Sequence, residues 1–190
     1  MNNVEVIIIF IVSVYVLFTI QKKYYEAIYV KSTVDDTNYV VKNVEDAVEA
    51  ANILARLNIN IQKLLEHVKT KYPNDENIHR LLSNYNQDNI SEGTETSNYT
   101  SYSVNKGEKL VFCLRSRDGT NTFVDENVLM YVATHELSHL MTKEIGHPDS
   151  FWENFKSLLQ DAIDVGVYKK VDFSKNPVNY CGIDIKSSVI

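Results

Sequence analysis

The chain has 190 residues, which is enough for one domain of ordinary size and an appendage. Its formal net charge is -6, from 19 Lys and Arg against 25 Asp and Glu. No basic cluster stands out either, so nucleic acid is not expected among its partners. The two cysteines, Cys113 and Cys181, are too few for a disulfide framework. They could pair once, but two reduced, buried thiols are expected if the domain is cytosolic.

Residues 4–20 are an almost unbroken apolar run that contains one acid, Glu5. At 1.5 Å per residue, these 17 residues reach across a thin bilayer core of about 25–30 Å. No positive residue precedes the run and no small-residue cleavage site follows it, which argues against a signal peptide. Lys22 and Lys23 follow the run and favour a cytoplasmic position for the rest of the chain. We therefore expect residues 1–22 to be a single transmembrane anchor with the domain facing the cytoplasm; a buried core helix is the alternative.

Residues 23–99 are expected to form the helical N-terminal part of the domain. Apolar residues recur at helical spacing through its middle, and Pro73 ends that pattern. The expected elements are a strand at 38–42, a long helix capped by Asn43 and ending near Lys71, a shorter helix at 76–85, and a polar loop at 86–99.

Residues 100–190 are expected to hold the core of the domain and a C-terminal tail. Two strands joined by a glycine turn predict a hairpin at its start. The elements are strands at 100–104 and 108–115, a helix capped by Asp125 or Asn127 and running to about Glu144, and a helix beginning near Ser150.

The first of these helices, which runs to about Glu144, carries His135-Glu136-Leu137-Ser138-His139. Four residues separate His135 and His139, so both imidazoles leave one face of the helix and can share a tetrahedral Zn²⁺. Glu136 lies about 100° round the helix, where its carboxylate could act as a general base on a zinc-bound water. His147 is the expected third ligand, because Gly146 can turn the chain back towards the metal.

Other readings of this pattern stay open. Glu144, Asp149, Asp161 or Asp164 could replace His147 as the third ligand. Two histidines and a glutamate can also occur on a helix by chance, although a polar triad in an apolar helix is costly unless something satisfies it.

The ordered set of motifs between residues 100 and 160 resembles the WLM-domain zinc metallopeptidases, which are related to the SprT family. The resemblance lies in the Asn105-Lys106-Gly107 turn, the following apolar strand that ends in Leu114-Arg115, the His-Glu-x-x-His helix, and His147 with Phe151 four residues on. Seven residues separate His139 from His147, where that family usually has five, so a longer turn is expected here. The family acts on proteins crosslinked to DNA, and this acidic, tethered chain is not expected to share that substrate.

This resemblance implies an α+β, zincin-like domain of long helices on a short sheet. It implies an endopeptidase that hydrolyses a protein or peptide substrate, with an extended substrate adding to the strand at 108–114. Together with the N-terminal transmembrane helix expected from residues 4–20, it predicts a membrane-anchored enzyme. Tyr168 and Tyr180 are candidates for a second electrophile, although packing is the commoner role of such residues. Two other hypotheses remain: an inactive, zinc-binding interaction module tethered to the membrane, and a structural membrane protein without metal.

Overall fold

The structure is a computed structural model that describes residues 3–24, 26–94 and 100–190. Its helices are α1 (Asn3–Tyr24), α2 (Ala47–Lys71), α3 (Glu76–Asn84), the 3₁₀ turn η1 (Gln87–Asn89), α4 (Glu126–Met141) and α5 (Asp149–Asp164). Its strands are β1 (Ala27–Lys31), β2 (Asn38–Lys42), β3 (Ile90–Glu92), β4 (Tyr102–Val104), β5 (Lys109–Phe112), β6 (Val178–Tyr180) and β7 (Ile183–Ile185). The described chain is therefore α+β, as the sequence predicts.

The main sheet has five strands in the order β1-β2-β3-β5-β4. The outer pairs, β1 with β2 and β4 with β5, are antiparallel hairpins, whereas β3 runs parallel to both of its neighbours. The β4–β5 hairpin is the one that the glycine turn predicts. Gly107 in this turn has a φ of +115°, and a Cβ there would collide with the backbone carbonyl of Asn84. Only glycine fits this position.

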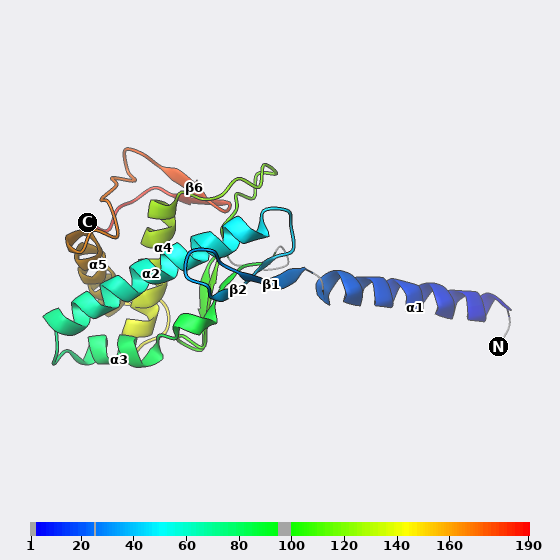
Figure 1. Cartoon of the computed structure of the whole chain (residues 1–190), viewed down its shortest axis with the longest axis horizontal. Coiled ribbons are helices and arrows are strands. Elements are labelled where there is room, and N and C mark those ends of the chain that lie inside the picture. Colours follow the sequence, from blue (N-terminus) through cyan, green and yellow to red (C-terminus); the bar gives the residue numbers. More distant parts are fainter. Residues whose placement is uncertain (1–2, 25, 95–99) are drawn as a thin grey trace.

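α2 is the central helix of the core. It packs on β1, β2 and β3 and also contacts α3, α4 and α5 (Figure 1). The sequence predicts its buried stripe correctly, and every member of that stripe is buried: Ala47, Ala51, Leu54, Ile61, Leu65 and Val68. The helix begins at Ala47 rather than at the expected Asn43 cap, and it ends before Pro73 as predicted.

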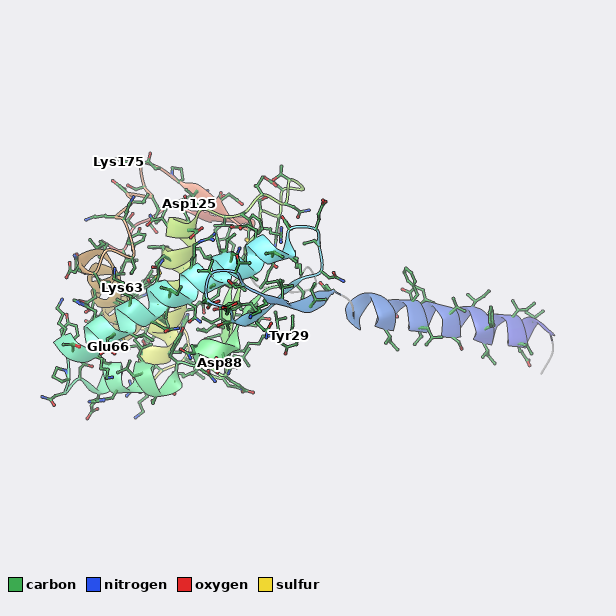
Figure 2. All side chains as sticks on the ribbon, in the orientation of Figure 1. Tyr29, Lys63, Glu66, Asp88, Asp125 and Lys175 are labelled. Atoms are coloured by element: carbon green, nitrogen blue, oxygen red, sulfur yellow. A yellow bond between two sulfur atoms is a disulfide. The ribbon has the colours of Figure 1, made fainter. Side chains whose placement is uncertain are left out.

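α1 extends away from the rest of the chain (Figure 1), and its side chains project on all sides (Figure 2). Its large apolar side chains between Val4 and Ile20 are exposed. Over the residues that the structure describes, no helix combines the length and the apolarity needed to cross a membrane. This finding corrects the predicted transmembrane anchor at residues 1–22.

The stretch predicted as a loop at 86–99 contains β3, the middle strand of the sheet; residues 95–99 lie outside the described residues. β3 is hard to recognise in the sequence because it contains polar residues, which are typical of a loop, and the fold buries them. Glu92 accepts hydrogen bonds from the backbone amide of Lys42 (2.8 Å) and from Nε of Arg115 (2.8 Å). Both partners are remote in sequence, so no local pattern shows that these polar groups can be buried.

The C-terminal hairpin β6–β7 is tied to the sheet by a disulfide between Cys113 and Cys181, 68 residues apart. This corrects the expectation of two reduced thiols. Tyr180, next to Cys181, is buried, and its hydroxyl donates a hydrogen bond to the carbonyl of Cys113 (3.0 Å).

Candidate metal centre

The helix that carries the predicted ligands begins as the sequence indicates. Asp125, labelled in Figure 2, caps α4, and its carboxylate accepts hydrogen bonds from the backbone amides of Asn127 (2.9 Å) and Val128 (3.2 Å). The helix packs against α3, α5 and the sheet. It is therefore held on several sides, and His135 and His139 are presented from a rigid element.

The structure brings His135, His139 and His147 together. One ring nitrogen from each lies within 4.8 Å of the others, and the Nε2 atoms of His135 and His147 are 3.2 Å apart. Two nitrogens bound to one tetrahedral Zn²⁺ at about 2.05 Å would be about 3.3 Å apart. The spacing of this pair therefore fits a shared zinc ion.

The electrostatics of the cluster also suit a cation. Burial, followed by repulsion from the neighbouring imidazoles, lowers the pKa of His135 to about 3. Burial, followed by the proximity of His147 and Lys106, lowers the pKa of His139 to about 4. Both rings are therefore neutral at pH 7, which is the form that binds a metal.

Phe151 forms the floor of the cluster. Its ring centroid lies 4.9 Å from that of His135, 4.4 Å from that of His139 and 4.6 Å from that of His147, and its side chain is fully buried. This explains the position of a phenylalanine one helical turn after His147: on α5, it faces all three imidazoles.

The turn that carries His147 is held by a lysine from the β4–β5 hairpin. The ammonium group of Lys106 donates hydrogen bonds to the backbone carbonyls of Thr142 (2.5 Å), Lys143 (2.6 Å) and Glu144 (3.0 Å). In the same region, Arg80 donates to the carbonyl of Met141 (2.8 Å). These cations satisfy carbonyls at and beyond the C-terminal end of α4 and fix the path of the chain towards Gly146, whose φ is +85°.

Glu136 is buried on α4 and is not a member of the group formed by the three histidines. Its carboxylate accepts a hydrogen bond from the backbone amide of Ser103 in β4, and burial raises its pKa to about 7. The strand expected to receive a substrate, β5, is an interior strand paired with both β3 and β4. The predicted addition of a strand at 108–114 is therefore wrong.

The other candidates from the sequence are placed elsewhere. Among the described residues, neither Glu144 nor Asp149 joins the group of ring nitrogens. Asp161 and Asp164 lie beside His67, and both carboxylates pair with Lys71, at 2.6 Å and 3.4 Å. A cation there would have to displace that ammonium group, so we assign no metal to this second cluster.

The two tyrosines considered as electrophiles serve in packing. Tyr168 is buried, with its ring centroid 6.0 Å from that of Tyr131. The hydroxyl of Tyr180 is engaged with the carbonyl of Cys113 and lies 2.6 Å from the hydroxyl of Ser101.

The sequence reasoning missed how Lys106 supports the turn. The signal was its place in the Asn105-Lys106-Gly107 turn, where Asn105 and Lys106 both have positive φ angles. Such a turn aims a side chain away from its own hairpin, but only the fold shows which carbonyls the ammonium group meets.

Comparison with known proteins gives three viral relatives that carry no assigned function. An uncharacterized protein of Acanthamoeba polyphaga mimivirus is 31% identical over 179 residues, which cover 92% of this chain and 90% of the relative. An uncharacterized protein of Invertebrate iridescent virus 6 is 26% identical over 161 residues, covering 80% of this chain and 85% of the relative. An uncharacterized protein of Invertebrate iridescent virus 3 is 36% identical over 84 residues, 44% of this chain and 50% of the relative. No solved structure matches the chain.

A sequence model of a capsid protein family, Phycodnaviridae minor capsid protein P4, matches residues 31–188. This match overturns the resemblance to WLM-domain metallopeptidases, and with it the prediction of a membrane-anchored zinc peptidase. The predicted role of Glu136 as a general base belonged to that peptidase, so we do not propose it for this chain. The match to a capsid protein family also corrects the predicted location, a single-pass membrane protein facing the cytoplasm. Capsid proteins contact other proteins, so the expected partners of this chain are proteins. With more than four-fifths of its length matched, the chain belongs to the Phycodnaviridae minor capsid protein P4 family.

Proposed function

We propose that this chain is a structural protein of a viral capsid, and that His135, His139 and His147 hold a zinc ion that fixes the turn between α4 and α5. The structural role is supported by the capsid family that matches residues 31–188. The zinc site is supported by three imidazoles whose ring nitrogens converge within 4.8 Å.

Zinc is the metal that this ligand set favours. Imidazole nitrogen suits Zn²⁺, whereas Mg²⁺ and Ca²⁺ prefer oxygen ligands. The ion would link α4 to the turn that leads into α5. It would thus fasten two helices whose other contacts are mainly apolar, such as the tilted rings of Tyr131 and Phe155, with centroids 5.2 Å apart.

The structural role is tested by the location of the protein. Mass spectrometry of purified particles of the virus that encodes this chain should find it in the particle at a fixed ratio to the major shell protein. Its absence from purified particles, with the protein present in infected cells, would overturn the proposal.

The metal site is tested by metal analysis of the full-length chain. We expect one zinc per chain, and we expect His135→Ala or His139→Ala to lose it, because two imidazoles bind zinc far more weakly than three. His79→Ala on α3 is the matched control, since His79 is exposed and outside the cluster. Glu136→Gln should also keep the metal, because Glu136 is not a ligand here. Equal zinc content in the His135, His139 and His79 variants would contradict the assigned site.

Lys106→Met should weaken zinc binding without removing a ligand. Loss of the ammonium group frees the carbonyls of residues 142–144 and loosens the turn before His147. Changes to groups that position ligands cost about 10–100-fold in metal affinity, and competition with a chromophoric chelator would measure the loss. Lys109→Met, an exposed lysine on the same hairpin, is the control. An unchanged zinc affinity in Lys106→Met would show that the turn before His147 keeps its conformation without this lysine.

A further inference from the structure

We propose that an acidic side chain of another capsid protein completes the coordination of the metal and seats against Ile145 and Trp152. This inference rests on the zinc site proposed above and names what that site binds.

The three histidines are too few to close a structural zinc site. Structural zinc sites are almost always closed by four protein ligands. Within the residues that the structure describes, the group around this point contains three, His135, His139 and His147. The nearby acids are otherwise engaged or apart: Glu136 accepts from the amide of Ser103, and Glu144 accepts from the hydroxyl of Ser150 at 3.3 Å. A structural site here therefore takes its fourth ligand from outside these residues.

The cluster is open to solvent on the side of His147. His135 and His139 are half-buried, whereas His147 is exposed. Two large apolar residues lie close to His147, Ile145 in the same turn of the chain and Trp152 in ring contact. Ile145 is 94% exposed, and Trp152 is 45% exposed with its ring centroid 5.6 Å from that of His147. Exposed tryptophan next to a specific polar contact is typical of the residues that dominate protein interfaces.

The charge at the metal site determines which kind of side chain would bind there. Imidazole ligands contribute no negative charge, so a bound Zn²⁺ would keep its double positive charge, and the ammonium group of Lys106 lies on the carbonyls of the turn before His147. A bound dication would therefore make this point positive on a chain whose net charge is -6. A carboxylate neutralises that charge and offers zinc an oxygen ligand at about 2.0–2.2 Å. The occupant that fits is therefore a protein segment with an aspartate or glutamate beside an apolar residue.

The test uses the full-length chain loaded with Co²⁺, whose visible absorption reports its ligands, and two carboxylate probes. Acetate carries the carboxylate alone, and 3-phenylpropionate adds an apolar group that can reach Trp152. We expect both to change the cobalt spectrum saturably, with phenylpropionate binding about tenfold more tightly because it buries apolar surface. The chain has a single tryptophan, so the fluorescence of Trp152 gives an independent readout at the same place.

The apolar rim is tested with Ile145→Ser and Trp152→Ala. Both should remove most of the tenfold preference for phenylpropionate over acetate, with the two probes compared in the same cobalt-loaded variant. Ile183→Ser is the matched control, since Ile183 is 55% exposed on β7 and lies outside the flanking pair. This variant should keep the preference.

The outcomes separate the two proposals. A chain that binds no Co²⁺ or Zn²⁺ would overturn both the zinc site and this inference. A chain that binds one metal ion but shows no spectral change with either carboxylate would overturn this inference alone. A preference for phenylpropionate that survives in Ile145→Ser and Trp152→Ala would overturn the seat on these two residues.

Discussion

Arg115→Met is expected to lower the free energy of unfolding by about 3–5 kcal/mol, because it leaves the buried carboxylate of Glu92 without its cation. Arg115 is 3% exposed and donates hydrogen bonds to Glu92 (2.8 Å) and to Asp46 (2.5 Å). Its guanidinium group also lies over the ring of Phe123, 4.4 Å from the centroid. Urea unfolding followed by circular dichroism would measure the loss.

The matched control is Arg56→Met. Arg56 binds Glu126 and Glu49 with comparable distances, 2.7 Å and 2.8 Å, but its side chain is 35% exposed. Water screens that pair, so its loss should cost about 1 kcal/mol or less. Adding Glu92→Gln to Arg115→Met should restore part of the stability, since glutamine still accepts from the amide of Lys42 without a buried charge. Equal effects of Arg115→Met and Arg56→Met would contradict the buried ion pair as the cause.

Breaking the disulfide between Cys113 and Cys181 should lower the free energy of unfolding by about 4 kcal/mol. The two cysteines are 68 residues apart, and a cross-link over such a loop removes much of the freedom of the unfolded chain. The double variant Cys113→Ser/Cys181→Ser should therefore unfold at a lower urea concentration than the oxidised chain.

Reduction provides the control for this prediction. A reductant should shift the wild-type chain to the stability of the double variant and leave the double variant itself unchanged. Thiol labelling of the unfolded chain, followed by intact mass, would count the free cysteines: none before reduction and two after. Two free thiols in the chain as purified, with stability unaffected by reductant, would show that the bond does not form.

Periodicity was enough to predict the helices that position the histidines. The stripes of α2 and the Asp125 cap of α4 are local features, and both are present in the structure. The convergence of His135, His139 and His147 followed from four-residue spacing and a glycine turn, and the structure places the three rings together. A local pattern predicts local geometry well.

What the sequence could not show depends on contacts between distant residues. β3 looked like a loop because its buried Glu92 is satisfied by Arg115, 23 positions later. The disulfide could not be predicted because Cys181 meets Cys113, just after β5, only when the C-terminal tail folds back on the sheet. The family was mistaken because a short metal-binding pattern can arise on many folds and serve many roles, so the His-Glu-x-x-His helix could not identify an enzyme.

The disulfide also changes how this domain would carry a mechanical load. It joins the end of the main sheet directly to the C-terminal hairpin, and the residues between the two cysteines include α4, α5 and all three histidines. A pull between the sheet and the residues that follow Cys181 would pass through the sulfur–sulfur bond. The segment that carries the three histidines would then lie outside the line of force, and we expect such tension to leave the spacing of the three imidazoles undisturbed.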